Sequence, residues 1–290
     1  MHARAAAATT TALLGAAVVL PLPTAHAAVS DDRPLVVAHR GASAQAPENT
    51  LAAVDRAARL GFSWVENDVQ RTKDGKLVVI HDDSLARTTD VEKVFPGRAP
   101  WKVKDFTAAE IARLDAGSWF SPRYKGARVP TLKQYMNRVS HNHQKLVLEI
   151  KNPGLYPGIE RETLKVLSNE GWLGPSQVRH KLVIQSFDAN SIRRVHALRP
   201  DIKTGFLGTP SFAQLPAYAR FADQINSSHT TLSRGYVATI HALRGPHGKP
   251  LEILTWTVDT PRDARRVAGL GVDGIITNKP DVVRKALREG

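Results

Sequence analysis

Short apolar runs recur along the chain and alternate with segments of helical pattern. The strand-like runs occupy residues 35–39, 64–69, 77–81, 146–150, 182–186, 202–207, 253–258 and 274–277, and residues 222–227 form a weaker ninth run. Several are continuously apolar, which is typical of strands that are covered on both faces. Strands that alternate with helices predict a parallel sheet, and about eight such units predict a closed (β/α)₈ TIM barrel.

The run at residues 77–81 does not fit this alternation. Only a turn separates it from the preceding run, with Lys73-Asp74-Gly75 at the tip. Parallel neighbours need a crossover of a dozen or more residues, so we expect an antiparallel β-hairpin here. The eight remaining runs then make a complete barrel. Residues 82–130 carry little strand signal and predict a small insertion after the hairpin, of a length that is usually functional.

Capping patterns support the helices between the strands. Asn49 or Thr50 can cap a helix that ends at Gly61, and Thr107-x-x-Glu110 fits a capping box. Thr260-Pro261 combines a cap with a proline in the first turn.

The first 27 residues have the pattern of a cleavable secretory signal. Arg4 gives a positive start, residues 5–22 are uncharged and apolar or small, and Ala25-His26-Ala27 fits an A-x-A cleavage site. A membrane anchor is the competing interpretation, but the leucine- and valine-rich part is short and is broken by Pro21 and Pro23. The sequence therefore predicts a secreted protein with no stable membrane anchor and a single catalytic domain in residues 28–290.

Composition limits the partners of this domain. The chain has no cysteine, so an exported form depends on its core alone, which a domain of this size can build. The formal net charge of +13 favours anionic partners such as phosphodiesters or wall polymers, or serves solubility alone. No lysine/arginine run tracks a nucleic-acid backbone, so nucleic acid is not expected as a partner. We expect a monomer or a weak dimer.

Three acidic residues lie inside apolar strand runs. Glu66 and Asp68 are two residues apart, so in a strand they point to the same face, and Glu149 lies in a later run. Carboxylates pushed together inside a barrel repel one another unless a cation lies between them. Oxygen ligands of this kind suit one divalent cation, Ca²⁺, Mg²⁺ or Mn²⁺. The competing interpretation is internal salt bridging, for example between Glu149 and Lys151.

Two histidines close strand runs near these acids. His39 is followed by Arg40-Gly41 and His81 by Asp82. A pair of imidazoles can divide protonation and deprotonation of two ester oxygens. Arg40 offers a planar fork for phosphate oxygens and Lys151 a point charge, although either could be a structural counter-ion. Glu48 is expected to start a helix and to orient His39 or Arg40.

Ordered sequence blocks extend this pattern through most of the chain after residue 27. They are His39-Arg40-Gly41, Ala46-Pro47-Glu48-Asn49-Thr50, Glu66-x-Asp68-Val69-Gln70, Thr72-Lys73-Asp74-Gly75, Val79-Ile80-His81-Asp82, Leu114-Asp115-Ala116-Gly117-Ser118-Trp119-Phe120, Val129-Pro130-Thr131-Leu132, Leu148-Glu149-Ile150-Lys151, Gln185-Ser186-Phe187-Asp188, Trp256-Thr257-Val258 and Asp273-Gly274-Ile275-Ile276-Thr277. The series resembles the glycerophosphodiester phosphodiesterases, of the bacterial secreted type within the phospholipase-C-like phosphodiesterases.

The resemblance implies a role for each candidate residue. It implies a divalent cation on Glu66, Asp68 and Glu149, with His39 and His81 as acid and base. Phosphate would bind Arg40 and Lys151, and Phe187 and Trp256 would line the pocket beside glycerol or its substituent. Hydrolysis of a glycerophosphodiester would give glycerol 3-phosphate and an alcohol. A glycerol hydroxyl attacking phosphorus first, to make a cyclic phosphate that water opens, is the hypothesis for its course.

Three residues depart from the family pattern. Asn67 stands where an apolar residue is usual, on the face opposite Glu66 and Asp68, and needs a hydrogen-bonding partner or costs ~1–3 kcal/mol. Asp259 stands where asparagine is common and Asn278 where aspartate is common. The two exchanges compensate each other if these strand ends adjoin. We expect none of the three to touch the catalytic set.

Two other functions stay open at this point. A phospholipase on intact lipid, like sphingomyelinase D or phosphoinositide-specific phospholipase C, would use the same barrel with an exposed apolar rim. A non-catalytic module that binds anionic wall or surface polymers would need only the positive charge. For an exported basic hydrolase, fragments of wall teichoic acid are a further substrate option.

Overall fold

The computed structural model describes residue 2 and residues 33–289. The signal predicted in residues 1–27 lies outside the described residues, apart from His2. Residues 33–289 belong to a single compact unit. All that follows concerns this unit.

Eight parallel strands form a closed barrel. Strand β1 pairs with β9 on one side and with β2 on the other, and the pairings β2–β4, β4–β5, β5–β6, β6–β7, β7–β8 and β8–β9 complete the ring. The strands are β1 (Leu35–Ala38), β2 (Trp64–Arg71), β4 (Lys145–Ile150), β5 (Leu182–Ser186), β6 (Lys203–Leu207), β7 (Gln224–Ser228), β8 (Leu254–Trp256) and β9 (Gly274–Thr277). The predicted (β/α)₈ TIM barrel is confirmed, including the weak strand signal at residues 222–227.

The remaining strand, β3 (Leu77–Val79), pairs antiparallel with β2 in the register Val69↔Val79. The predicted hairpin is therefore confirmed, and it carries the chain away from the barrel wall. β1 ends at Ala38 and β3 at Val79, so His39 and His81 lie in the loops just after these strands and do not close them. Both histidines remain at the carboxyl-terminal mouth of the barrel.

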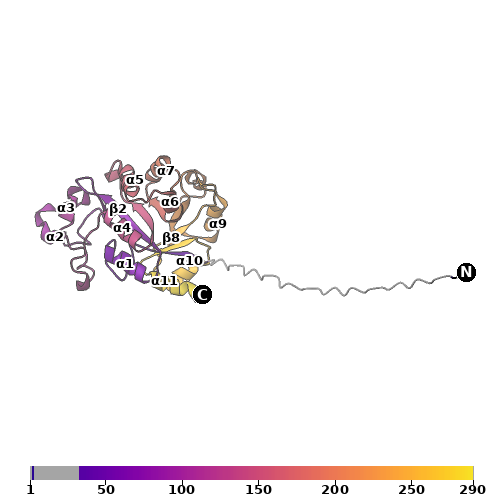
Figure 1. Cartoon of the computed structure of the whole chain (residues 1–290), viewed down its shortest axis with the longest axis horizontal. Helices are drawn as coiled ribbons and strands as arrows, with labels where there is room; N and C mark the ends of the chain where they lie inside the picture. Colours follow the sequence, from indigo (N-terminus) through magenta and orange to yellow (C-terminus); the bar gives the residue numbers. More distant parts are fainter. Residues whose placement is uncertain (1, 3–32, 290) are drawn as a thin grey trace. The chain divides into compact units, whose positions relative to one another are not determined.

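Helices cover the outside of the barrel, mostly as expected from their caps. Thr50, not Asn49, caps α1 (Leu51–Arg59), and Thr260 caps α10 (Pro261–Ala268). The other outer helices are α4 (Leu132–His141), α5 (Ile159–Asn169), α6 (Pro175–His180), α7 (Ala189–Leu198), α8 (Leu215–Tyr218), α9 (Arg234–Ala242) and α11 (Pro280–Arg288). Figure 1 shows α5, α6, α7 and α9 to α11 arranged around the strands.

The insertion between β3 and α4 packs around a small core of its own. It contains α2 (Val91–Val94), α3 (Ala108–Ile111) and short 3₁₀ turns at Pro96–Arg98, Val103–Asp105 and Pro122–Tyr124. The predicted capping box of Thr107 and Glu110 starts α3. Buried Leu85, Val103, Phe106, Ile111 and Leu114 form the centre of this core. α2 and α3 lie together at one edge of the molecule (Figure 1).

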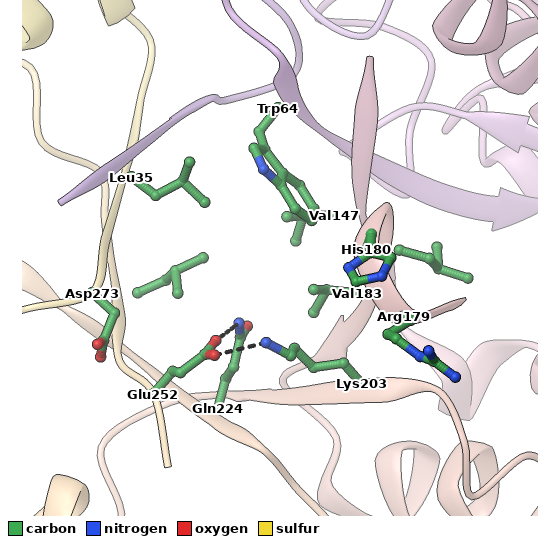
Figure 2. A pocket seen from close by; sticks show the side chains of 12 residues that line it. Leu35, Trp64, Val147, Arg179, His180, Val183, Lys203, Gln224, Glu252 and Asp273 are labelled. Carbon is green, nitrogen blue, oxygen red and sulfur yellow. Dashed lines mark hydrogen bonds and ion pairs between the residues drawn. The ribbon is translucent and has the colours of Figure 1, made fainter. Parts of the chain in front are cut away.

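Inside the barrel, the apolar filling is thin and polar groups close both ends. The apolar cluster inside the barrel consists of Val37, Val147, Val183, Leu254 and Ile276. At the amino-terminal mouth, Glu252 accepts hydrogen bonds from Lys203 and Gln224, both at 2.7 Å, beside a cavity of about 250 Å³ (Figure 2). The acids and histidines singled out in the sequence lie toward the other mouth, where barrel enzymes carry their active sites.

Asn67 points outward from β2 into the layer between barrel and helices. It is fully buried, and neither its Oδ1 nor its Nδ2 has a hydrogen-bond partner within the described part of the chain. No described protein group therefore supplies the partner that this amide needs, which predicts a cost of ~1–3 kcal/mol. Among the described residues, no helix has the length and hydropathy needed to cross a membrane.

Candidate active site

Three carboxylates converge inside the barrel near its carboxyl-terminal mouth. Glu66 and Asp68 alternate with the outward-facing Asn67 on β2, and the parallel register places Asp68 beside Glu149 of β4. One carboxylate oxygen of each residue lies within 4.8 Å of the others, and all three side chains are buried. The strand period and the β2–β4 register thus bring together acids that are more than 80 residues apart in sequence.

The charges of these carboxylates are incompletely balanced by the protein. Lys151 Nζ lies 2.8 Å from Glu149 and 3.8 Å from Asp68, so the salt bridge considered from sequence is present. Glu66 Oε1 and Asp68 Oδ1 are nonetheless buried without a hydrogen-bond partner among residues 33–289. Two buried acceptors that face a third carboxylate fit a hard cation with oxygen ligands.

The pKa values of the three acids reflect this arrangement. Burial, followed by the charges of Asp68 and Glu149, raises the pKa of Glu66 well above its usual range. Burial and Asp68 raise the pKa of Glu149 to about 8. Burial opposes ionisation of Asp68 as well, but Arg40 and Lys151 outweigh it and lower the pKa of Asp68. Without a cation, Asp68 is therefore the acid of the three that favours its charged form.

Asn49 is a residue whose role the sequence reasoning missed. It adopts a left-handed backbone conformation with φ of 59° and is 3% exposed. Its Nδ2 donates to Asp68 Oδ2 at 2.8 Å. Asn49 was considered as a helix cap, but in the structure it fixes the orientation of a candidate metal ligand. The available signal was a pair of adjacent capping candidates, Asn49 and Thr50, of which α1 uses only Thr50.

His39 is held by a chain of hydrogen bonds from the far end of the sequence. Its Nδ1 lies 2.7 Å from Asn278 Oδ1, and Asn278 Nδ2 donates to Asp259 Oδ2 at 2.7 Å. The two exchanged positions therefore adjoin, as their compensation requires. The expectation that neither touches the catalytic set was wrong, because Asn278 contacts His39 directly.

The asparagine also defines the protonation of His39. Asp259 can only accept, so the Nδ2 group of Asn278 faces it and the Oδ1 atom faces His39. Nδ1 of His39 then carries the proton, and Nε2 is left as the acceptor. Burial, followed by the charge of Arg40, lowers the pKa of His39 to about 4. The neutral ring can accept a proton at Nε2 at neutral pH.

His81 has a carboxylate partner instead of an amide. Its Nδ1 lies 2.6 Å from Asp82 Oδ1. Burial alone would raise the pKa of Asp82, but hydrogen bonds from Arg87 and His81 prevail and lower the pKa to about 2. An ionised Asp82 fixes the Nδ1–H tautomer and leaves the other nitrogen of His81 for substrate.

Arg40 lies between the acids and Glu48. Its Nη1 donates to Glu48 Oε1 at 2.8 Å, and its Nε lies 3.3 Å from Asp68 Oδ2. Glu48 was expected to orient His39 or Arg40, and it accepts hydrogen bonds from Arg40 and from Arg87 of the insertion. Arg87 was not singled out from sequence, where it is one of 40 lysines and arginines.

A cavity of about 130 Å³ collects most of the candidate residues. The candidate residues in its lining are His39, Arg40, Glu66, His81, Glu149, Lys151, Phe187 and Trp256. The lining is completed by Gln185, Leu207, Thr257 and Ile276. Asp68 lies beneath the lining, with no exposed surface. The rings of Phe187 and Trp256 meet edge to face at 5.4 Å, and Lys151 Nζ lies 5.3 Å from the Phe187 centroid.

A wider, more open groove continues from this cavity. His81 and Lys151 line both, and the groove of about 600 Å³ is also lined by Asp82, Asp83 and Leu155. His81 therefore stands at the boundary between a small polar pocket and an open channel. A substrate whose small constant part fits the cavity and whose larger variable part lies in the groove would have the bond between the two parts beside His81.

Comparisons with known proteins agree with this geometry. The model of the glycerophosphoryl diester phosphodiesterase family matches residues 39–282. A glycerophosphodiester phosphodiesterase of Bacillus subtilis (strain 168) is 35% identical over 89% of this chain and 87% of its own length. A glycerophosphodiester phosphodiesterase of Caldanaerobacter subterraneus subsp. tengcongensis is 37% identical over 88% of this chain and 98% of its own length.

A solved structure extends the likeness to the fold. The phosphodiesterase of Oleispira antarctica in complex with the product sn-glycerol-3-phosphate matches with a TM-score of 0.75 and 29% identity, over 88% of this chain and 97% of that chain. The order of the motifs, the barrel fold and the sequence identity thus indicate the same family over nearly the whole described unit. The chain belongs to the glycerophosphoryl diester phosphodiesterase family and is an enzyme of the glycerophosphodiester phosphodiesterase class.

Proposed function

We propose that this enzyme hydrolyses glycerophosphodiesters by a metal-dependent mechanism in which His39 acts as the base and His81 as the acid. The products are glycerol 3-phosphate and an alcohol. The observation that carries the proposal is the convergence of three buried carboxylates beside the two imidazoles. Two of the three have an oxygen atom with no hydrogen-bond partner among the described residues.

Glu66, Asp68 and Glu149 would hold one divalent cation, Ca²⁺, Mg²⁺ or Mn²⁺. Such an ion, when bound, supplies Lewis-acid polarisation of a phosphoryl oxygen. Asn49 and Lys151 fix the orientation of Asp68 and Glu149 through their contacts of 2.8 Å. Glu66 Oε1 and Asp68 Oδ1, which accept no hydrogen bond from the described residues, are the acceptors that remain for the ion.

Arg40 and Lys151 would bind the phosphate. Both line the cavity and both are held by carboxylates, so their positively charged groups are placed before substrate arrives. Preorganised charges stabilise a transition state without rearrangement during the reaction. Arg40 can present two parallel N–H groups, whereas Lys151 acts as a point charge.

His39 would take the proton of the attacking hydroxyl. Its Nδ1–H is used by Asn278, so the lone pair of Nε2 is available. A neutral ring at the working pH is what a base requires. As the acid, His81 would carry protons on both ring nitrogens: Nδ1–H stays on Asp82, and the proton of Nε2 goes to the departing alcohol. Its place between the small cavity and the groove supports this role.

We retain the two-step course as part of the proposal. A glycerol hydroxyl attacks phosphorus and loses its proton to His39, while the bond from phosphorus to the leaving alcohol breaks and His81 protonates that oxygen. Water then opens the cyclic phosphate, with the two histidines in exchanged roles. Rapid-quench analysis should trap the cyclic phosphate, and ¹⁸O transfer in a single displacement would contradict the course.

The lining of the cavity supports a deacylated substrate over an intact lipid. The small cavity has six titratable side chains in its lining (His39, Arg40, Glu66, His81, Glu149 and Lys151), which suit a glycerol phosphate moiety better than acyl chains. The open groove can take a bulky leaving group, which includes a fragment of wall teichoic acid. Rates on glycerophosphocholine and on the corresponding micellar phospholipid should favour the former. We also propose that the protein is a monomer or a weak dimer, which size-exclusion chromatography tests. We further propose that the predicted signal directs its export, which fractionation of expressing cells tests.

The decisive assay follows glycerol 3-phosphate from a panel of glycerophosphodiesters. Stripped enzyme should be inactive in EDTA and should recover with one of Ca²⁺, Mg²⁺ or Mn²⁺. His39→Ala and His81→Ala should each lose activity by about 10²–10⁴-fold. His241→Ala is the matched control, because His241 also pairs with an aspartate, at 2.9 Å, away from the site. Full turnover in excess EDTA, or an active His81→Ala enzyme, would refute the proposal.

A further inference from the structure

Arg87 occupies an unusual position between two parts of the candidate site. It belongs to the insertion, outside the barrel, and its side chain is 45% exposed. Its guanidinium nevertheless forms four hydrogen bonds with two carboxylates that each hold a candidate active-site residue. An arginine whose role was only to attach the insertion would have no reason to engage both of these groups.

The first arm of the arrangement leads to His81. Arg87 Nε donates to Asp82 Oδ2 at 2.6 Å and Nη2 donates to Oδ1 at 3.1 Å. The same Oδ1 atom lies 2.6 Å from Nδ1 of His81. Two hydrogen bonds from a planar fork fix the rotation of the Asp82 carboxylate, and that carboxylate sets the plane of the imidazole.

The second arm leads to Arg40. Arg87 Nη1 donates to Glu48 Oε2 at 2.9 Å and Nη2 donates to Oε1 at 2.8 Å. Glu48 Oε1 also accepts from Arg40 Nη1 at 2.8 Å. Glu48 is mostly buried, with 13% of its side chain exposed, so the two arginines hold it from both sides.

We propose that Arg87 is a positioning residue that locks His81, through Asp82, and Arg40, through Glu48, into one hydrogen-bonded frame. The inference rests on the roles given to His81 and Arg40 above. Arg87 lines neither the small cavity nor the groove. Through Arg87 the insertion contributes to catalysis. His81 and Arg40 keep their relative positions only while the guanidinium of Arg87 binds both Asp82 and Glu48.

The fork geometry makes the role specific to arginine. A lysine has a single ammonium group and cannot donate two parallel hydrogen bonds to each of two carboxylates. Arg87→Lys is therefore expected to recover the charge and little of the positioning. Arg87→Met retains much of the aliphatic stem and removes every donor.

The neighbouring ion pair offers a matched control. Lys102 of the insertion lies 2.8 Å from Asp83, one residue after Asp82, and is 35% exposed. This pair also joins a later part of the insertion to its first residues after β3, but Lys102 makes its side-chain hydrogen bond to Asp83 and not to Asp82 or Glu48. Lys102→Met should remove one such bridge and leave kcat within about 2-fold of wild type.

The test compares two substrates in each preparation. Glycerophosphocholine releases an alcohol that must be protonated, whereas the p-nitrophenyl ester of glycerol 3-phosphate releases an anion that leaves without an acid. If Arg87 acts through His81, Arg87→Met should lower kcat on glycerophosphocholine by about 10- to 100-fold and on the nitrophenyl ester by much less. The ratio of the two rates does not depend on the folded fraction, so partial unfolding does not obscure it.

A double-mutant cycle separates the two arms. Arg87→Met added to Asp82→Asn should lower kcat little further, because the first arm is already broken. Glu48→Gln should chiefly raise KM on both substrates, since it loosens Arg40. Equal losses on the two substrates, or additive losses with Asp82→Asn, would overturn the inference. An active His81→Ala enzyme would instead overturn the proposed function.

Discussion

Glu66→Gln should stabilise the metal-free enzyme while removing its response to metal. In the folded chain, burial and the charges of Asp68 and Glu149 raise the pKa of Glu66. An acid with a raised pKa takes up a proton on folding, so stability falls as pH rises from its ordinary pKa toward the raised value. Glutamine carries no charge and can keep the acceptor that the backbone N–H of Arg40 uses at 3.0 Å.

The magnitude follows from the geometry in two ways. Two unit charges 4.8 Å apart repel by about 3 kcal/mol at an effective dielectric constant of about 20. Keeping a buried carboxyl protonated costs about 1.4 kcal/mol for each pH unit above its ordinary pKa, up to its raised pKa. In EDTA at pH 7, Glu66→Gln should therefore raise Tm by about 5–10 °C for a domain of this size.

Thermal unfolding followed by circular dichroism is the assay, from pH 5 to pH 8 in EDTA and with millimolar Ca²⁺, Mg²⁺ or Mn²⁺. The advantage of the variant in EDTA should grow with pH. Added metal at 100 times its Kd should raise the free energy of unfolding of the wild type by about 3 kcal/mol and therefore raise its Tm. The Tm of the variant should stay nearly unchanged. Glu252→Gln is the control, because Glu252 is a barrel carboxylate already paired with Lys203 at 2.7 Å.

A variant less stable than wild type in EDTA across this pH range would refute the electrostatic reasoning. So would an equal metal response in the two proteins. Either result would mean that Glu66 is satisfied by the protein itself and that no cation is needed among these acids.

Three further predictions concern residues around the site. Asn67→Leu should raise the free energy of unfolding by about 1–3 kcal/mol with unchanged kcat, as chemical denaturation and a steady-state assay can measure; a loss of stability would mean that Asn67 has a partner. Exchanging Asp259→Asn and Asn278→Asp together should place a carboxylate against His39, raise its pKa and move the acidic limb of the kcat/KM profile to higher pH; an unmoved limb would count against His39 as the base. Gly41→Ala should destabilise the fold by at least 1 kcal/mol in urea unfolding, because φ is +81° there and a Cβ would lie 2.6 Å from another side chain; a neutral effect would contradict this strain.

Much of the fold was predictable because it depends on local pattern and counting. Apolar runs of strand length, a gap too short for a crossover and the caps at Thr107 and Thr260 are properties of neighbouring residues. Once eight parallel strands are counted, closure into a barrel places every strand end at one mouth. That argument places His39 at the carboxyl-terminal mouth, and the predicted hairpin above the barrel places His81 near it.

The contacts around the site were less predictable because they join distant segments. Asn278 reaches His39 across 239 positions, and Arg87 reaches Glu48 across 39. No periodicity relates such residues, and an asparagine or arginine has no pattern that marks it as a positioning group. The exchanged Asp259 and Asn278 were an available signal for the first contact, and their effect on His39 depended on the loops after β8 and β9 adjoining the end of β1.

The most direct test is a crystal structure of the enzyme with Mn²⁺ and glycerol 3-phosphate, read by the anomalous signal of the metal. We predict a single manganese peak within about 2.0–2.5 Å of oxygen atoms of Glu66, Asp68 and Glu149. The phosphate should contact that ion and lie within hydrogen-bond reach of both His39 and His81. A manganese ion bound elsewhere, or a phosphate beyond reach of either ring, would contradict the account.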